Sequence, residues 1–501
     1  MKIFNYKNLN TIEIVKVLFS LIARVWNMLL VFLLTPIYIK YLGIESYGLI
    51  GFFVLMQSLL MALEFGFPLS LNRAIAKLRS KKIDINEISG TLKSFEYLFI
   101  FMAIVVLCIV GIPLSIFHNS FINPESLTSS IVSISVFLII LQISLRFPII
   151  IYQAALTGFE KIVDLNILMI FFSTIRMGGS GLALAKFNFD IVSFFTFQVI
   201  VVFLELLVTR FYCWNFNNLR KKIDFNFKFI ISQKNFIFTA FSISLIGIIL
   251  SQIDKMIIVS NLPLESFGEY SVMVLYGSAI LALGNPIGSV SFPAFSRLSE
   301  QSQEDALLNK LGEYIPIASL ILLPISLFLI FFSDEVLRFY LEKPLSQEII
   351  KLFPIYLLGA MFAAFIPLFN GLLLSSNYSR DALYILLVNS IIYIPGLFLL
   401  IKIFGVYGAT YTFCIIQFLI FISFIFRSGF IYGINLVLRK LLYLFLLPLF
   451  FIFVTTLSLK EIYLSFFKNS TGTDILFMLV CLVISQLLAF IIYIYRHKFS
   501  Y

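Results

Sequence analysis

The sequence is poor in charge, in histidine and in cysteine. Charged residues make up 12% of the 501 residues, whereas a soluble protein carries about 25%, so a water-soluble fold would not cover the apolar surface. The two histidines, His118 and His497, fall outside the apolar segments, which excludes a histidine metal site or proton relay inside them. The four cysteines are scattered and form no CxxC pair, so neither a disulfide framework nor a cysteine metal site is predicted.

Nucleotide-binding signals are absent as well. No GxxxxGK[ST] loop occurs in the sequence, which excludes a self-contained ATPase. The segments between the apolar runs are too short for a soluble domain, so any chemistry must occur within a helical bundle or on its loops. We therefore expect no cofactor and no enzymatic activity, and transport energy from an H⁺ or Na⁺ gradient, a substrate gradient or a partner.

Long apolar runs recur from end to end. Each is long enough to cross a hydrocarbon core of about 30 Å, and each is continuously apolar rather than alternating, which excludes a β-barrel. A window of about 19 residues predicts an all-α polytopic membrane protein with about 14 spans. These lie near 12–37, 47–70, 94–117, 128–155, 163–185, 190–213, 235–260, 267–292, 313–333, 352–375, 379–403, 406–427, 439–459 and 473–495.

The net charge of +10 is concentrated in alternate loops, such as 77–82 and 220–228. Positive charge is enriched in cytoplasmic loops of membrane proteins, so we expect both termini in the cytoplasm. The basic excess is then explained by topology and contact with anionic lipids, and no nucleic-acid partner is predicted.

A weak internal repeat divides the chain. Leu42–Leu78 aligns without gaps on Leu262–Leu298, at an offset of 220 (262 − 42), with 11 identical residues in 37. Related helical halves are a common construction of secondary transporters. The offset covers six spans, so the halves would be parallel repeats. We predict a bundle at 1–215, a cytoplasmic connector at 216–234, a second bundle at 235–430 and an additional helix pair at 431–501.

Charged residues inside the spans are the candidate functional residues. A charge at a span centre costs about 2.5–3.5 kcal/mol on insertion scales, so such residues face a protein interior or a wet cavity. Arg24, Arg146 and Arg176 exceed the acids deep in the first half. Because guanidinium groups bind phosphate oxygens in bidentate fashion, we predict that these three bind an anionic substrate such as a lipid-linked diphosphate. The alternative is that each is paired to a neighbour or reaches an interface.

The acids suggest where an ion would couple. Asp254 is the one acid deep in the second half, and we predict it as the ion-coupling residue, with ion pairing as the alternative. Lys255 is a poor partner by this reasoning, because adjacent positions on a helix do not face each other. Glu64, Arg73 and Lys255 are secondary candidates, although Arg73 begins a basic loop and is more simply part of it.

The segment Leu34–Leu78 resembles the N-terminal signature of bacterial polysaccharide transporters, the O-antigen and capsule repeat-unit flippases. The matching positions are Pro36, Tyr38, Leu42, Gly43, Tyr47, Gly48, Gly66 and Arg73, and 252–255 with Leu264–Tyr270 resembles the corresponding segment of the second half. The resemblance implies membership of the multidrug/oligosaccharidyl-lipid/polysaccharide exporter superfamily. It also implies two six-helix bundles around a central cavity.

The function implied by the resemblance is the flipping of an undecaprenyl-diphosphate-linked oligosaccharide across the bacterial inner membrane, for O-antigen, capsule or exopolysaccharide assembly. A glycan polymerase is an expected partner. Two transport alternatives remain open, namely a multidrug exporter, which would favour acidic cavity residues, and a flippase for the peptidoglycan precursor. A scaffold without transport activity is a third alternative.

Overall fold

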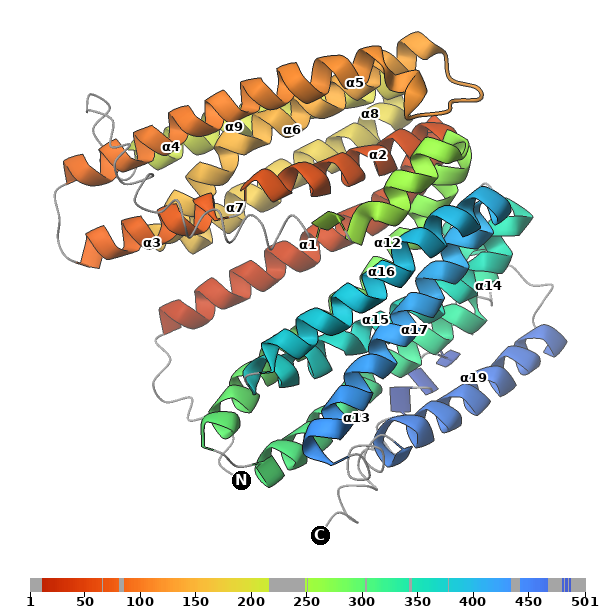
Figure 1. The fold of residues 1–501 in the computed structure, drawn as a ribbon. Coiled ribbons are helices and arrows are strands. Elements are labelled where there is room, and N and C mark those ends of the chain that lie inside the picture. Colours follow the sequence, from red (N-terminus) through yellow and green to blue (C-terminus); the bar gives the residue numbers. More distant parts are fainter. Residues whose placement is uncertain are drawn as a thin grey trace. The chain divides into compact units, whose positions relative to one another are not determined.

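A computed structural model describes residues 11–487, except 65, 81–84, 216–247, 250, 302–303, 342–344, 377, 434–441, 467–479, 482 and 485. The chain divides into two compact units, Met1–Gly268 and Glu269–Tyr501. Both are helical (Figure 1). The predicted connector at 216–234 lies outside the described residues, and the division between the units falls within a helix, α12, further along the chain.

Unit 1 contains nine numbered helices before α12. They are α1 (Thr11–Leu42), α2 (Ile44–Met61), α3 (Phe67–Ser80), α4 (Ile85–Val106), α5 (Ile112–Ile116), α6 (Ser129–Gly158), α7 (Ile162–Ser173), α8 (Ser180–Phe187) and α9 (Ile191–Asn215). Two π-helical turns, Leu107–Gly111 and Thr174–Gly179, join α4 to α5 and α7 to α8. The helix at 251–261 also belongs to this unit.

Unit 2 begins at Glu269, within helix α12 (Leu264–Glu300). Its other helices are α13 (Glu304–Phe331), α14 (Ser333–Tyr340), α15 (Gln347–Ser375), α16 (Ser379–Phe404), α17 (Val406–Tyr432) and α19 (Leu447–Phe466), the last preceded by a π-helical turn at Leu442–Leu446.

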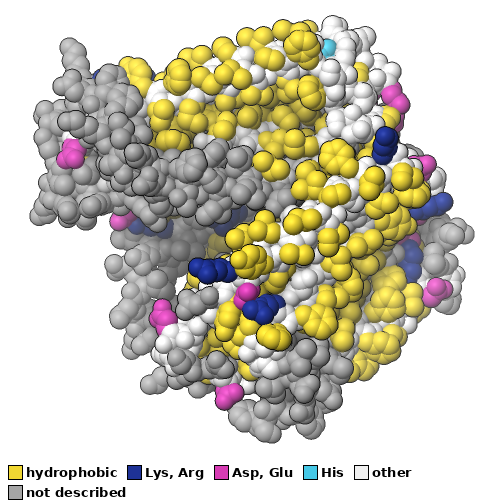
Figure 2. Space-filling model, in the orientation of Figure 1, with side chains coloured by type: hydrophobic (Ala, Val, Ile, Leu, Met, Phe, Trp, Pro, Cys, Tyr) yellow, Lys and Arg dark blue, Asp and Glu magenta, His cyan; other side chains and the backbone are white. Residues whose placement is uncertain are grey.

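Twelve helical segments of the described chain are long and apolar enough to cross a membrane, which confirms the all-helical, multi-pass prediction. Hydrophobic side chains dominate the described surface in Figure 2, as expected where lipid is the solvent. The remaining two predicted spans, 235–260 and 473–495, lie largely outside the described residues.

Local sequence explains where the segments end. The second predicted span, 47–70, stops at Glu64, because Gly66 adopts a positive φ of 93° that ends the helix. Pro68 then occupies the first turn of α3, where its missing N–H costs no hydrogen bond. At the start of α9, the Ser193 backbone donates to the Asp190 carboxylate at 2.9 Å. Hydrogen bonds from Ser193 lower the pKa of Asp190.

Helix α6 forms the centre of unit 1. It packs against α9, α3 and α4, and α6 and α9 run side by side in Figure 1. Three hydrogen-bonded pairs join α1 to the α7–α8 segment, namely Asn166 to Ser20, Trp26 to Thr174, and Tyr38 to Ser180. These hydrogen bonds fasten α1, which carries Arg24, to the segment that carries Arg176.

The sequence repeat also appears as a symmetric helix crossing within unit 1. A Cβ on Gly48 would lie 2.5 Å from the Leu264 carbonyl oxygen, and a Cβ on Gly268 would lie 2.3 Å from the Ile44 carbonyl oxygen. Gly48 and Gly268 are equivalent at the offset of 220, as are Ile44 and Leu264. The identical glycines therefore allow the first turns of α2 and α12 to touch backbone to backbone, since any larger residue would separate them.

A second repeated feature is a glutamate that holds the start of a later helix. In unit 1, Glu45 accepts hydrogen bonds from the Glu125 and Ser126 backbone amides and from the Ser126 hydroxyl, just before α6. In unit 2, Glu269 accepts from the Ser346 amide at 2.6 Å and hydroxyl at 2.7 Å, just before α15. The two serines are equivalent at the offset of 220. We call these two contacts the glutamate clamps.

The two clamps differ in one respect. The residue equivalent to Glu45 in the repeat is Glu265, which is exposed, and the unit 2 clamp is made by Glu269 one helical turn later. Residues four apart lie on the same helix face. The clamp thus has the same geometry in both units, while the residue that makes it has moved by one turn.

Candidate functional site

Arg176, one of the predicted arginines, is half-buried and forms an ion pair. It lies on the π-helical turn Thr174–Gly179, a local irregularity that is frequent at functional sites. Its Nη1 lies 3.1 Å from Oε2 of Glu205 on α9, and the two side chains are 12% and 7% exposed. The pair neutralises both charges within the helical bundle. This ion pair is the alternative that the sequence left open for Arg176, and its role in substrate binding stays a prediction.

Arg146 differs from Arg176 because it has no partner at hydrogen-bond or ion-pair distance among the described residues. It lies on α6 and is half-buried. Helix α6 packs against α2, α3 and α9, so Arg146 lies in the same helical bundle as Glu64 and the Arg176–Glu205 pair. A guanidinium without a close partner keeps its N–H donors available for a ligand.

Arg24 lies on α1 and is exposed. Within the part of the chain that the structure describes, it makes no hydrogen bond or ion pair. It stands on the same helix as Trp26, which bonds to Thr174 two residues before Arg176. Among the described side chains, Arg24 and Arg146 are thus the predicted arginines with no acid at ion-pair distance.

Glu64 ends the second span, and Arg73 lies nine residues further along the chain, in α3. Glu64 is buried, with 7% of its surface exposed, and makes no hydrogen bond or ion pair with any described residue. Arg73 falls in α3, and its side chain lies outside the described part of the structure.

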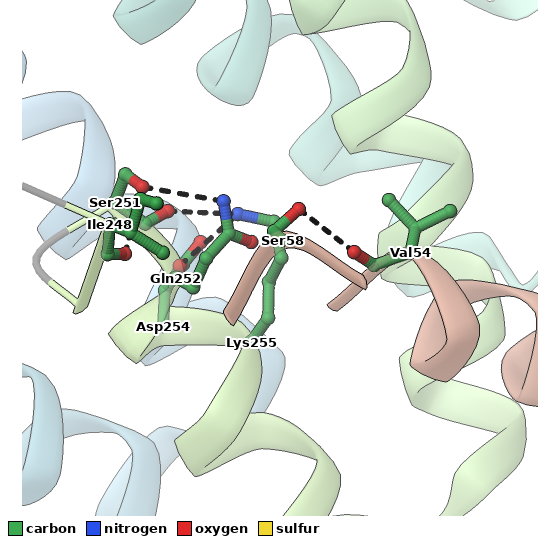
Figure 3. A network of polar contacts seen from close by, with 7 residues as sticks. All are labelled: Val54, Ser58, Ile248, Ser251, Gln252, Asp254 and Lys255. Carbon is green, nitrogen blue, oxygen red and sulfur yellow. Dashed lines mark hydrogen bonds and ion pairs between the residues drawn. The ribbon is translucent and has the colours of Figure 1, made fainter. Parts of the chain in front are cut away.

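Asp254 pairs with its neighbour, contrary to the expectation from helix geometry. Lys255 Nζ lies 3.3 Å from Asp254 Oδ1, and the side chains are 14% and 4% exposed. Figure 3 shows the lysine turned back along its helix, where Nζ also donates to the Ser251 carbonyl oxygen at 3.2 Å. The argument from adjacent positions was wrong because a long, flexible lysine side chain can curl to reach a neighbour that a rigid one cannot.

Sequence reasoning missed a further polar cluster in unit 1, built around a buried glutamate. Glu96 on α4 accepts hydrogen bonds from Arg210 Nε at 2.8 Å and Trp214 Nε1 at 2.9 Å, both on α9. Glu96 is 4% exposed, so the cluster fastens α4 to α9. A signal was present, since Glu96 and Arg210 each stand in a predicted span, but the partners are 114 residues apart in sequence.

Metal binding has no structural support in the described residues, where no group of three or more histidine, cysteine, aspartate or glutamate side chains is placed to hold an ion. The chemistry that Arg146, Glu64, Arg176 and Glu205 offer is instead electrostatic. Arg146 and Glu64 have no partner at ion-pair distance among the described residues, whereas Arg176 and Glu205 form a neutral pair. Such a set suits the reversible binding of an anion.

Solved structures with the same fold are membrane transporters. The lipid II flippase MurJ in an inward closed conformation superposes with a TM-score of 0.71 at 16% identity, covering 96% of this chain and 99% of that one. An inward-facing multidrug transporter of the MATE family gives 0.62 at 14% identity, covering 82% and 95%. The MATE multidrug transporter DinF-BH gives 0.54 at 14% identity, covering 85% and 98%. The fold is thus that of the transporters of the MOP superfamily.

By sequence, the chain matches none of the curated proteins. A family model, described as polysaccharide biosynthesis protein, matches residues 15–299. The chain belongs to this polysaccharide biosynthesis family, as the signature at Leu34–Leu78 implied.

Proposed function

We propose that this protein is a flippase that moves a polyprenyl-diphosphate-linked oligosaccharide repeat unit from the cytoplasmic to the periplasmic leaflet of the bacterial cytoplasmic membrane. The product would serve O-antigen, capsule or exopolysaccharide assembly. Membership of the polysaccharide biosynthesis family supports a glycan as cargo. The similarity to a lipid II flippase supports a lipid-linked form of it.

The observation that carries the proposal is the uncompensated charge of Arg146 inside unit 1. A guanidinium in an apolar bundle is costly unless an anion or water solvates it, and no acid of the described chain lies at ion-pair distance. A diphosphate offers two or more negative charges and oxygens spaced for bidentate hydrogen bonds. In this account Arg146 binds the diphosphate during passage, and Arg24 on α1 contacts the same headgroup or anionic sugars.

The other residues have supporting roles in this proposal. Arg176, neutralised by Glu205, holds the π-helical turn against α9 and shapes the site. The prenyl tail stays in the lipid while the glycan and diphosphate cross, and the protein alternates between inward and outward access with energy from H⁺ or Na⁺. No covalent step is involved. A glycan polymerase would receive the flipped repeat unit.

The direct test uses a strain that lacks this protein. Membrane lipids are extracted and searched by mass spectrometry for polyprenyl-diphosphate oligosaccharide, with a periplasmic lectin reporting its accessibility. We expect a complete repeat unit to accumulate in a form shielded from the lectin, and restoration of the gene to reverse this. Absence of any shielded lipid-linked glycan would contradict the proposal.

One alternative has an observation in its favour. The extent of the match to the lipid II flippase, which covers nearly all of both chains, is compatible with the peptidoglycan precursor as substrate. Viability separates the two possibilities, because loss of a sole precursor flippase is lethal, while loss of a repeat-unit flippase leaves cells able to grow. Shielded lipid II in the depleted strain would support the alternative.

A further inference from the structure

A groove lies along one face of α9, close to the C-terminal end of that helix. Its volume is about 430 Å³, and it is lined by Leu207, Val208, Arg210, Phe211 and Trp214. Positions 207, 210, 211 and 214 are three or four residues apart, so they share one face of the helix. The three aliphatic and phenyl side chains of the groove are exposed, and exposed apolar surface on a membrane-spanning helix contacts lipid. The groove therefore opens toward the lipid phase.

Arg210 supplies positive charge to this groove from a fixed position. Its Nε donates to Glu96 Oε1 at 2.8 Å, and Trp214 Nε1 donates to Glu96 Oε2 at 2.9 Å. The Glu96 side chain is 5% exposed, whereas the Arg210 side chain is 55% exposed. The ion pair thus presents its positive end to the groove. Since a guanidinium has five N–H donors and Glu96 takes the one on Nε, further donors remain accessible to a ligand.

The place of Arg210 along α9 matches the depth of lipid headgroups. The helix has 25 residues and a length of about 37 Å, which exceeds the hydrocarbon core of about 30 Å. Arg210 stands five residues (215 − 210) before the end of the helix at Asn215, or about 7 Å from it. It is therefore near the boundary between hydrocarbon and headgroups, where tryptophan is also enriched. The sequence continues into the basic segment 220–228, and such segments favour a leaflet with anionic lipids.

We propose that this groove binds an anionic phospholipid of the surrounding membrane, and that Arg210 binds its phosphate. The phosphodiester carries one negative charge and oxygens that accept hydrogen bonds from a guanidinium. The acyl chains would lie along Leu207, Val208 and Phe211. A free phosphate would gain the polar contact alone, whereas a lipid also covers the apolar wall, and this favours the lipid as occupant. The inference goes beyond the proposed function, because this lipid stays in its own leaflet and is not the cargo.

Tryptophan fluorescence tests the proposal, because Trp214 lines the groove and the chain has one other tryptophan, Trp26. The full-length W26F protein is placed in phosphatidylcholine nanodiscs that contain a small, fixed fraction of brominated lipid, which quenches a tryptophan that it contacts. The brominated lipid is either phosphatidylglycerol or phosphatidylcholine. We expect brominated phosphatidylglycerol to occupy the groove about fivefold more readily, the factor expected for one arginine at an anionic headgroup.

Matched variants in the W26F background separate lipid recognition from folding. V208E places a carboxylate in the groove and leaves the Arg210–Glu96 contact intact, so it should abolish the preference for phosphatidylglycerol. V208Q, which has a similar size and no charge, should keep the preference. R210Q should abolish it as well. R338Q, which removes an exposed arginine whose Nε also bonds to an acid, should keep it.

Several outcomes would overturn the proposal. Equal quenching by the two brominated lipids in W26F would do so, and so would an unchanged preference in V208E. Loss of the preference on addition of inorganic phosphate would identify the ligand as a free anion instead of a lipid. Displacement of brominated phosphatidylglycerol by farnesyl diphosphate would assign the groove to prenyl diphosphates. The proposed function is tested separately by lectin accessibility of the lipid-linked glycan, so failure of either leaves the other standing.

Discussion

The two units share their construction and differ in where they carry charge. Each has a glutamate clamp that fixes the start of a long helix, α6 in unit 1 and α15 in unit 2. In unit 2, the described membrane-spanning helices carry charge only near their ends, as in the pairs Arg427–Asp381 and Lys460–Glu335. In unit 1, charged residues stand well inside the spans, including Arg146 and the Arg176–Glu205 pair.

This difference distinguishes features that stabilise the fold from features that serve the function. A feature found in both units, at equivalent serines, serves the fold that both repeats share. Charge within a span carries an energetic cost, so its restriction to unit 1 among the described helices indicates a task that the described helices of unit 2 do not perform. Unit 1 is therefore where we place anion recognition.

The largest effect is expected from breaking the buried pair in unit 1. Glu205→Gln leaves Arg176 buried without a counter-charge, which should lower the free energy of unfolding by about 3–5 kcal/mol. Thermal unfolding in detergent measures this. Asp334→Asn, in the exposed Arg338–Asp334 pair of unit 2, is the matched control and should cost about 0–1 kcal/mol. The double variant R176Q/E205Q should recover much of the loss, and a double variant as unstable as E205Q would contradict the pairing.

A smaller effect is expected on ligand affinity from Arg146. Arg146→Gln removes a charged hydrogen-bond donor worth about 1.5–3 kcal/mol, so farnesyl diphosphate should bind about 10- to 100-fold more weakly. Stability should change little, because no described partner is left unpaired. Arg338→Gln, on the exposed face of α14, should bind the ligand like the wild type. Equal affinity in R146Q and the wild type would remove anion recognition from this position.

The glutamate clamps provide a test in which both units should respond alike. Glu45→Gln and Glu269→Gln each weaken charge-assisted hydrogen bonds to a backbone amide and a serine, at a cost of about 1–3 kcal/mol each. Differential scanning fluorimetry of the two variants should give similar decreases in unfolding temperature. A large decrease in one and none in the other would show that the clamps are not equivalent.

The smallest effect is expected at Glu265. It aligns with Glu45 in the repeat, yet it is exposed and the clamp belongs to Glu269. Glu265→Gln should therefore change the free energy of unfolding by no more than about 0.5 kcal/mol. Destabilisation equal to that of E269Q would mean that the alignment, rather than the observed geometry, identifies the clamp.

Much of the fold was predictable, because span length and continuous apolarity depend only on local sequence. Twelve predicted spans are confirmed as apolar helices, and the offset of 220 relates Gly48 to Gly268 and one clamp serine to the other. Partner choice was less predictable. The pairing of Arg176 with Glu205, 29 residues away, depends on how α9 packs beside the π-helical turn. The pairing of Asp254 with Lys255 depends on a side-chain rotamer.

The same limit applies to the candidate site. The sequence identified the arginines inside the spans, but not which of them keeps an uncompensated charge. Glu64 was a secondary candidate, and its burial without a close polar partner among the described residues depends on the packing of the neighbouring helices. Helix packing decides which charges are neutralised, and packing contacts here join residues far apart in the chain.

The central claim is that the uncompensated Arg146 of unit 1 carries a lipid-linked diphosphate across the membrane. The most direct measurement is lectin accessibility of the lipid-linked repeat unit in the deletion strain, restored with either R146Q or R338Q at matched protein levels. We predict that R338Q restores accessibility, while with R146Q the complete repeat unit stays shielded at the cytoplasmic leaflet. Full accessibility with R146Q would contradict the account.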